Sequence, residues 1–282
     1  MTGTTSPDVS PNPTDVGNMY DQMTNHFTEI LGDNIHLGYW DDDHDPATPA
    51  QASDRLTDLV ADRLAVPAAA EVLDVGCGSG RATARIAVRT KTHVTGITVS
   101  PHQVRLALAR PETGLGAGQA SFQLTDAMDL PFSDGRFAAA FAIESIVHMS
   151  DRARAFAGIT RVLQPGGTLV TSDFFIEGTL TGDAAEIIRA ARAPMALPPF
   201  PASGEYQELM GRAGLEVADF VDITDNIRRS HQVIADTSRR LVAELELDAT
   251  LKTQVLASAD LTEQIAALPH LHYALTTARR PA

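Results

Sequence analysis

Residues 72–80 read VLDVGCGSG, and this run is the strongest fold signal in the chain. Three of its first four residues are apolar strand formers, so the run can begin as a buried β-strand. Glycine then occupies every second position from Gly76 to Gly80, and glycine tolerates the positive φ angles of a sharp turn. Without Cβ atoms in the turn, a ligand can lie directly against the backbone. Residues 81–87 can start a helix whose free N–H groups face that ligand.

The glycine spacing excludes two common nucleotide-binding motifs. A dinucleotide fingerprint, G-x-G-x-x-G, would place its third glycine at Arg81, and a Walker A loop would need a Gly-Lys-Ser/Thr run. Glycines alone are weak evidence, and a tight turn without a ligand is the plain alternative. Asp74, two residues before the first glycine, makes the pattern more specific. D-x-G-x-G-x-G after a buried strand resembles motif I of the class I S-adenosylmethionine-dependent methyltransferases.

The composition is typical of a globular protein with a large core. The 282 residues are 44% apolar, and no apolar run approaches the ~20 residues of a membrane span. Residues 1–15 are polar and lack the apolar centre of a signal peptide, so we expect a cytoplasmic protein. The lone Cys77 excludes an intrachain disulfide and favours a small buried side chain in the glycine turn.

The charge pattern argues against several classes of partner. The formal net charge is −14, and Lys91 and Lys252 are the only lysines. Because no basic stripe runs along the chain, we expect neither nucleic acid nor a membrane surface as a partner. We predict no metal site, since the acidic run at residues 41–45 lacks the spacing of a calcium loop and is typical of a solvated loop.

Strand and helix signals alternate along the middle of the chain. Strands are expected at Glu71–Val75, His93–Ile97, Ala120–Leu124, Phe137–Ile143 and Thr168–Ser172, and later at Leu215–Ile223 and Leu271–Ala278. Ser100 before Pro101 predicts the start of one helix, and Asp151–Leu163 predicts another. In the central part, successive strands are about 20–30 residues apart, the size of a βαβ unit. The pattern predicts an α/β, Rossmann-like parallel sheet with helices on both faces and a ligand beyond the strands' carboxyl ends.

The chain divides into five expected segments. These are a flexible tail at 1–14, an N-terminal helical cap at 15–60, an α/β core for cofactor binding at 61–177, a lid or irregular cover at 178–205, and the end of the core sheet with a helical substrate cap at 206–282. Four prolines between 194 and 201 mark the lid. The sequence leaves open whether the proline-rich N-terminus crosses to a neighbouring chain in a homo-oligomer.

Several other segments carry the same resemblance as the glycine run. They are residues 19–21 (MYD), 34–40 (NIHLGYW), 126–132 (DAMDLPF), 144–149 (ESIVHM), 161–167 (RVLQPGG) and 273–275 (YAL). Together they are similar to small-molecule methyltransferases of bacterial natural-product pathways, especially sugar O-methyltransferases of the rebeccamycin type. The resemblance covers nearly the whole chain after Asp15. It implies a seven-stranded sheet whose last strand runs antiparallel, with S-adenosyl-L-methionine as the cofactor.

The resemblance also implies which residues bind that cofactor. They are Tyr20, Trp40, Asp74, Gly76, Gly78, Gly80, Thr98, Gln103, Asp126, Ala127, Ile143 and Glu144. Asp74 and the glycine turn would hold the methionine part, Asp126 and the backbone of Ala127 the adenine, and Tyr20 the carboxylate. Trp40 would cap the pocket, and Ile143 and Glu144 would close its strand-four end. A helix N-cap is the alternative role for Asp126.

One position departs from the family pattern. The family often has an acid at the end of the second strand, where it binds both ribose hydroxyls, but this chain has Thr98. Threonine offers a hydroxyl without a charge, so we expect a weaker ribose contact that Gln103 assists. The missing acid also argues against a nicotinamide cofactor.

Two residues are candidates for the chemistry of methyl transfer. His148 follows the fourth strand, and an unperturbed imidazole titrates near neutrality, so it can take a proton from an acceptor hydroxyl. A structural histidine is the alternative, but the match to sugar O-methyltransferases favours a base. That family has two adjacent histidines, and the first aligns with Val147 here. Asp173, at the end of the fifth strand, would orient His148 or meet the acceptor; a turn cap is its alternative role.

These features predict a methyltransferase of secondary metabolism that acts on oxygen. The apolar side chains Phe174, Phe175, Met195, Leu197 and Phe200 favour a hydrophobic or glycosidic acceptor. Arg228, Arg229 and His231 are candidates to meet polar groups on it, with a solvated helix start as the alternative. A C-methyltransferase, with or without coupled cyclisation, and a cyclase that transfers no methyl group are the alternative functions, because a fold alone does not determine chemistry.

Overall fold

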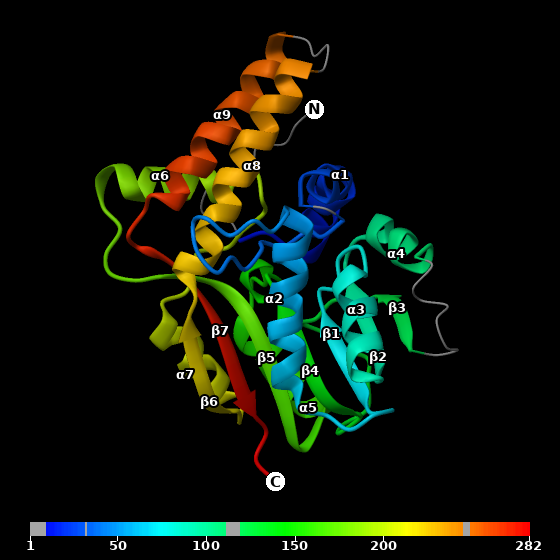
Figure 1. Cartoon of the computed structure of the whole chain (residues 1–282). Helices are drawn as coiled ribbons and strands as arrows, with labels where there is room; N and C mark the ends of the chain where they lie inside the picture. Colours follow the sequence, from blue (N-terminus) through cyan, green and yellow to red (C-terminus); the bar gives the residue numbers. More distant parts are fainter. Residues whose placement is uncertain (1–9, 32, 111–118, 245–248) are drawn as a thin grey trace.

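Seven strands form a single sheet in the part of the chain that the computed structural model describes, residues 10–31, 33–110, 119–244 and 249–282. The order is β3-β2-β1-β4-β5-β7-β6, and β7 pairs antiparallel with both β5 and β6 (Figure 1). The strands are β1 (Glu71–Val75), β2 (His93–Thr98), β3 (Ala120–Leu124), β4 (Phe137–Ile143), β5 (Leu163–Ile176), β6 (Glu216–Asp222) and β7 (Leu271–Arg279). The predicted Rossmann-like sheet with an antiparallel last strand is confirmed.

Helices surround this sheet. They are α1 (Pro13–Leu31), α2 (Pro49–Leu64), α3 (Arg81–Thr90), α4 (Pro101–Leu108), α5 (Arg152–Val162), α6 (Gly182–Arg192), α7 (Ser203–Arg212), α8 (Thr224–Glu244) and α9 (Ala249–Ala266), and η2 (Ile146–His148) is a 3-10 turn. The predicted caps are present. Ser100 Oγ accepts a hydrogen bond from the amide of Gln103 at 3.0 Å, and Asp151 Oδ1 accepts one from the amide of Arg154 at 2.9 Å. Among the described helices, none is long and apolar enough to span a membrane.

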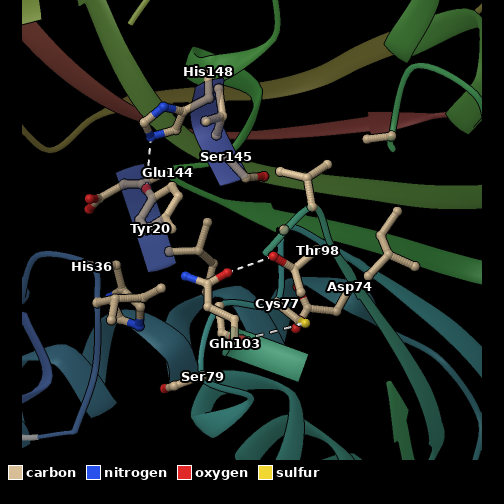
Figure 2. A pocket seen from close by; sticks show the side chains of 18 of the residues that line it. Tyr20, His36, Asp74, Cys77, Ser79, Thr98, Gln103, Glu144, Ser145 and His148 are labelled. Atoms are coloured by element: carbon tan, nitrogen blue, oxygen red, sulfur yellow. Dashed lines mark hydrogen bonds between the residues drawn. The ribbon is translucent and has the colours of Figure 1, made fainter. Parts of the chain in front are cut away.

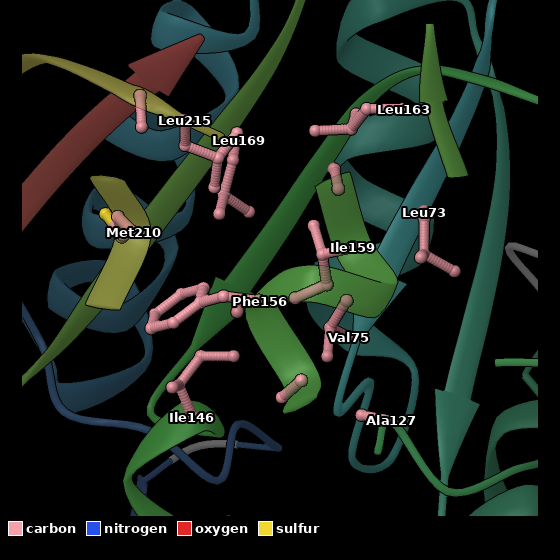
Figure 3. Close-up of a cluster of buried hydrophobic side chains, with 14 of the residues drawn as sticks. Leu73, Val75, Ala127, Ile146, Phe156, Ile159, Leu163, Leu169, Met210 and Leu215 are labelled. Atoms are coloured by element: carbon pink, nitrogen blue, oxygen red, sulfur yellow. The ribbon is translucent and has the colours of Figure 1, made fainter. Parts of the chain in front are cut away.

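The core lies on both faces of the sheet because successive strand residues point to opposite sides. On one face, Val72 packs in a cluster with Leu56 of α2 and Ile86 of α3. Leu73, the next residue, packs on the other face in a cluster with Phe156 and further residues of α5 and α7 (Figure 3). All five of these side chains are fully buried. Burial on both faces explains why the β1 run reads as nearly continuous apolar sequence.

Three boundaries differ from the sequence prediction. β5 begins at Leu163, directly after α5, because residues 165–167 extend the strand: the amide of Gly166 donates to Arg280 O at 2.9 Å. The segment predicted as a lid contains the regular helix α6, whose Ile188 packs against Leu268 of the α9–β7 connection. α1 begins at Pro13, inside the segment predicted as a flexible tail. Residues 1–9 of that tail lie outside the described residues.

The parallel strands end at one edge of the sheet, and this edge is covered by segments from both ends of the chain. α1, α6 and the α8–α9 pair lie beyond it in Figure 1. α1 contacts α4, α2 and α8, so the N-terminal cap bridges the two halves of the sheet. A ligand bound at this edge is therefore enclosed between the strand ends and the cap.

Candidate active site

A cavity that is partly open to solvent lies where β1, β2 and β4 end. The predicted site residues that line it are Tyr20, Asp74, Gly76, Gly78, Thr98, Gln103, Asp126, Ala127, Ile143, Glu144 and His148 (Figure 2). Gly80, Trp40 and Asp173 are not among the described residues that line it. The tertiary structure thus brings together residues from position 20 to position 148 around one space.

The glycine turn forms one wall because only glycine fits there. Gly76 and Gly78 have φ angles of +86° and +53°. A Cβ atom on Gly76 would lie 2.3 Å from Ser145 Cβ, and one on Gly78 would lie 2.1 Å from Ile35 Cδ1. Gly80, also at positive φ, is the N-cap of α3, where a Cβ would meet Phe122 at 2.8 Å. Gly80 therefore shapes the turn from behind rather than lining the cavity.

Asp74 is a buried carboxyl group at the end of β1. Its exposed fraction is 2%, and Oδ2 accepts a hydrogen bond from Thr83 Oγ1 at 2.5 Å. Burial raises the pKa of Asp74 to about 7, although the Thr83 hydroxyl acts in the opposite direction. A cation bound nearby would lower this pKa again, because it stabilises the ionised form.

Thr98 and Gln103 form a hydrogen-bonded pair at the end of β2. Thr98 Oγ1 donates to Gln103 Oε1 at 2.6 Å, and Gln103 Nε2 donates to Thr24 Oγ1 of α1 at 3.1 Å. Both side chains line the cavity. The expected cooperation between these two residues has a geometric basis, and their contact with a ribose stays a prediction.

Asp126 and Ala127 lie at another wall of the cavity with Met128. Asp126 Oδ1 accepts a hydrogen bond from the amide of Met128 at 2.9 Å, which closes a local turn. This contact closes a turn and caps no helix, because no helix begins directly after Asp126 in the described residues, so the alternative role as a helix N-cap is wrong. Because the residue also lines the cavity, its role toward adenine stays a prediction.

Glu144 joins three parts of the chain at the end of β4. Oε1 accepts hydrogen bonds from the amide of Leu37 at 2.9 Å and from the hydroxyl of Tyr273 at 3.0 Å. Its φ angle of +50° is unusual for a residue with a side chain. Burial raises the pKa of Glu144 to about 7, despite these two donors. Glu144 therefore ties the N-terminal cap and β7 to the cavity edge.

His148 ends the turn η2 and contacts Tyr20 of α1. Tyr20 Oη lies 2.8 Å from His148 Nε2, and the two side chains point toward each other in Figure 2. Burial lowers the pKa of His148 to about 4, so the imidazole is neutral at pH 7. The buried Nδ1 makes no hydrogen bond within the described residues, and the backbone of Ala196 lies close to the imidazole ring.

Asp173 supports this turn from behind. It is 1% exposed, and Oδ2 accepts a hydrogen bond from the amide of Val147 at 2.9 Å. Burial raises the pKa of Asp173 to about 8. The contact is that of a turn cap, which was the alternative role, and it orients His148 only through the backbone of the turn.

Trp40 lies away from the cavity, beside α8. Its indole nitrogen donates to Ser230 Oγ at 3.0 Å, and the guanidinium of Arg229 lies 4.3 Å from the ring centroid. The nearby residues Asn34, Ile35 and His36 line the cavity instead. The resemblance of residues 34–40 to the family could have pointed to these three residues. It instead assigned the pocket role to the aromatic residue at the end of that segment, Trp40.

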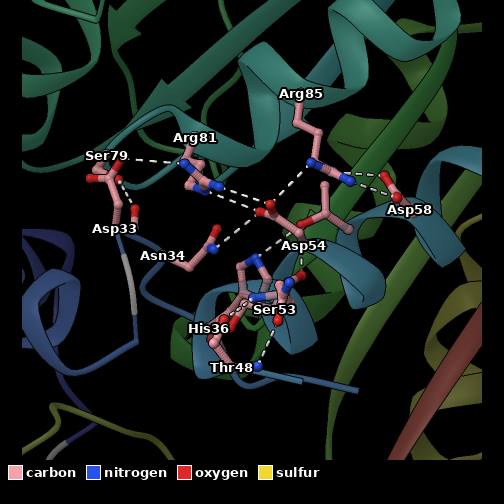
Figure 4. Close-up of polar contacts among 12 residues, drawn as sticks. Asp33, Asn34, His36, Thr48, Ser53, Asp54, Asp58, Ser79, Arg81 and Arg85 are labelled. Carbon is pink, nitrogen blue, oxygen red and sulfur yellow. Dashed lines mark hydrogen bonds and ion pairs between the residues drawn. The ribbon is translucent and has the colours of Figure 1, made fainter. Parts of the chain in front are cut away.

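A ladder of ion pairs fixes the N-terminal cap beside the cavity. Asp54 of α2 accepts hydrogen bonds from Arg81 at 2.8 and 3.0 Å and from Arg85 at 3.0 Å, and Asp58 accepts two from Arg85 at 2.7 Å (Figure 4). Residues four apart share one helix face, so α2 and α3 meet in register. Arg81 also lines the cavity, so this ladder connects the cap to the ligand space.

Known proteins share this sequence and fold. Residues 72–167 match a family model described as a methyltransferase domain. The chain is 41% identical over 217 residues to O-methyltransferase rstn1 of Aspergillus nomiae, covering 77% of this chain and 96% of that protein. It is 33% identical over 273 residues to 27-O-demethylrifamycin SV methyltransferase of Amycolatopsis mediterranei, covering 97% and 99%.

A solved structure agrees over the same length. The [4+2]-cyclase SpnF is 32% identical, with a TM-score of 0.81, and the match covers 97% of this chain and 98% of that chain. The glycine turn at Gly76, the antiparallel β7 and the relatives of high coverage all point to one family. The chain belongs to the class I S-adenosylmethionine-dependent methyltransferases.

Proposed function

We propose that this chain transfers a methyl group from S-adenosylmethionine to a hydroxyl group of a small secondary metabolite. The observation that carries the proposal is the neutral imidazole of His148 at the wall of the cavity that the glycine turn also lines. The names of the two relatives, an O-methyltransferase and a demethylrifamycin methyltransferase, support oxygen as the methylated atom.

The cavity residues fit this cofactor. The glycine turn lines the cavity with main-chain atoms of Gly76 and Gly78, because Cβ atoms there would collide with Ser145 and Ile35. The buried carboxyl of Asp74 lines the cavity, and an ammonium group is the partner that would keep it ionised. Asp126 and the backbone of Ala127 offer hydrogen-bonding groups for an adenine at the opposite end. The bound cofactor supplies a methyl group already activated by a positively charged sulfur.

The residues of the chain then align the acceptor, exclude water and take its proton. His148 Nε2 is the atom we assign to the proton, because it faces the phenol of Tyr20 at 2.8 Å and so carries its lone pair toward a hydroxyl. The acceptor hydroxyl approaches this nitrogen beside the phenol, which keeps the imidazole oriented. A low pKa is sufficient for this base, since an alcohol oxygen becomes strongly acidic as it gains a methyl group. Such base assistance typically contributes 10²–10⁴-fold.

The acceptor is a hydrophobic or glycosidic small molecule. Apolar side chains of β5, α6 and the 193–202 segment gather beyond the sheet edge, among them Phe174, Ile187 and Phe200. Phe175 is not part of this wall: it packs on the opposite face against Tyr206 and Phe220, because adjacent strand residues alternate sides. Arg229 donates to Asp45 O at 2.6 Å, which favours a structural role for it.

Labelled S-adenosylmethionine, incubated with the protein and a panel of polyketide aglycones and glycosides, tests the proposal. We expect label in at least one hydroxyl-bearing acceptor. His148→Ala should lower kcat by about 10²–10⁴-fold while the cofactor still binds. His44→Ala, at an exposed position, is the matched control and should leave kcat unchanged. Tight cofactor binding with no labelled acceptor would contradict the proposal.

A second function has one specific observation in its favour. SpnF, whose structure matches over 97% of this chain, is named a [4+2]-cyclase. Product mass separates the alternatives: methyl transfer to oxygen or carbon adds 14 Da to the acceptor, whereas a cyclase leaves the mass unchanged. His148→Ala separates oxygen from carbon, since a hydroxyl acceptor loses its proton from the methylated oxygen, which faces His148, whereas a carbon acceptor loses its proton from carbon after methyl transfer, to a base that need not be His148.

A further inference from the structure

The side chain of Arg152 reaches back from the first residue of α5 to the turn that carries His148. Nε donates to Ile146 O at 3.3 Å, and Nη2 donates to Val147 O at 3.0 Å. The side chain is half-buried, and burial lowers its pKa. An arginine stays charged in this setting, and its planar fork matches several carbonyl oxygens at once.

The same guanidinium holds the segment that covers the site. Nη2 also donates to Pro199 O at 2.9 Å. Arg192 at the end of α6 also binds this segment: its Nε donates to Leu197 O at 3.2 Å and to Pro198 O at 2.9 Å. The backbone of Ala196, in the same segment, lies beside the imidazole of His148. Residues 193–201, which we call the cover segment, therefore contact both the imidazole and the arginine beneath it.

The turn η2 needs this support because it is only three residues long. Its own hydrogen bonds are few: the amide of His148 donates to Ser145 O, and that of Met149 donates to Ile146 O. Short 3-10 turns have poor hydrogen-bond geometry and little stability of their own. Asp173 holds the turn at the Val147 amide, and Arg152 holds it at two carbonyls. The turn is thus fixed from both of its polar sides.

We propose that Arg152 is a positioning residue that fixes the His148 turn and couples its geometry to the seating of the cover segment. The proposal rests on the assignment of His148 as the proton acceptor under the proposed function. When the cover segment is seated, the three carbonyls of Ile146, Val147 and Pro199 share one guanidinium. When the cover segment moves away, the guanidinium of Arg152 loses its hydrogen bond to Pro199 O, and the turn that carries His148 becomes less rigid.

Arg152→Lys is the decisive variant, since lysine keeps the charge but has no planar fork. Histidine NMR on the full chain, with the His148 signal assigned through His148→Ala, measures the imidazole titration without any acceptor. We expect Arg152→Lys to raise the pKa of His148 from about 4 toward its ordinary value near 6.5, because a loosened turn admits water. Arg154→Lys, on the same helix with a 59% exposed side chain, is the matched control and should not move it.

Activity gives the second measurement. Arg152→Lys should lower kcat by about 10- to 100-fold, since small misplacements of a catalytic group are costly, while cofactor affinity stays within about twofold. In a His148→Ala background the same substitution should have little further effect, because both act through one group. Additive losses, or an unchanged His148 titration in Arg152→Lys, would overturn the proposal.

The two proposals fail in distinguishable ways. If no acceptor is methylated but the histidine titration shifts as expected, the positioning role stands and the proposed function falls. If Arg152→Lys does not fold, Arg192→Gln replaces it. This substitution loosens the cover segment without touching the turn, so it should raise the pKa of His148 part of the way. An unchanged titration in Arg192→Gln would count against the coupling.

Discussion

Tyr20 Oη and His148 Nε2 lie 2.8 Å apart although 128 residues of sequence separate them. Burial raises the pKa of Tyr20, with smaller contributions from Glu144 and Asp173, and burial lowers that of His148 to about 4. Both groups are therefore neutral at pH 7. With Nε2 as the proposed proton acceptor, the phenol is the donor of this hydrogen bond and the ring proton is on Nδ1, which makes no hydrogen bond within the described residues. This contact places α1 in direct connection with the proposed base.

Tyr20→Phe separates two roles for this phenol. If the hydroxyl orients His148, kcat falls by about 5- to 30-fold, the cost of about 1–2 kcal/mol for losing a hydrogen bond at a buried group. Cofactor affinity then stays unchanged by calorimetric titration. If the hydroxyl instead binds the cofactor carboxylate, as the family resemblance implies, the dissociation constant rises. The contact in the structure predicts the first result, and a higher dissociation constant with normal kcat would contradict it.

Gly76→Ala and Gly78→Ala should each weaken cofactor binding and destabilise the fold by about 1–3 kcal/mol. Both positions have positive φ angles, and a Cβ atom would meet Ser145 or Ile35 at 2.3 or 2.1 Å. Gly204→Ala and Gly211→Ala in α7 are matched controls, since nothing lies within 4 Å of a Cβ there. These controls should stabilise by up to about 1 kcal/mol. Chemical denaturation measures both effects, and equal responses of the two pairs would refute the steric argument.

Asp54→Ala should destabilise the fold more than Asp62→Ala, although Arg89, which pairs with both Asp58 and Asp62, extends the ladder to Asp62. Asp54 is 17% exposed and pairs with two arginines, whereas Asp62 is 57% exposed and pairs with Arg89 at 2.6 Å. We expect a loss of about 1–2 kcal/mol for Asp54 and below about 0.5 kcal/mol for Asp62. Urea denaturation at low and high NaCl concentrations measures both losses. The difference between the two variants in the free energy of unfolding should become smaller at high NaCl. Equal losses would show that burial does not determine how much each ion pair of the ladder contributes to stability.

The buried carboxyl groups make the fold less stable at alkaline pH. Burial raises the pKa of Asp74 and Glu144 to about 7 and that of Asp173 to about 8. The folded chain therefore keeps protons that the unfolded chain releases above its ordinary values near 4. The stability from these groups is fully present below pH 4 and is lost as the pH rises through 7 to 8.

Three buried histidines act in the opposite direction at lower pH. Burial lowers the pKa of His36, His148 and His231 to about 4, so the unfolded chain binds protons between pH 6.5 and 4 that the folded chain refuses. Above pH 6.5 the histidines are neutral in both the folded and the unfolded chain, so only the buried carboxyl groups change the stability with pH. We expect the melting temperature to fall between pH 6.5 and 8.5, and Asp173→Asn to flatten that fall. A melting temperature that rises over this interval would contradict the assignment of the buried carboxyls.

Local sequence was sufficient to predict the elements of the core. Residues 72–80 contain the strand, the turn and the helix start in consecutive positions, and Ser100 caps its helix through its own next turn. The resemblance then predicted seven strands with an antiparallel last strand, while the order of the strands came from the structure. Asp74, Thr98 and Asp126 lie in or just after the carboxyl end of a strand, so their place at the cavity could be predicted, and their contact with the cofactor stays a prediction.

The remaining features needed the tertiary structure. Trp40 lies beside α8 and not at the cavity, and Asp173 faces the backbone of a turn and not the cavity, because packing between distant elements decides where a side chain points. The Tyr20–His148 contact and the grip of Arg152 on Pro199 join segments that no local pattern relates. Sequence alone determined the glycine turn and the sheet, since backbone sterics and burial act over neighbouring residues. Only the folded chain decided which groups surround the imidazole, since hydrogen bonds of about 3 Å form between whichever elements the core packs together.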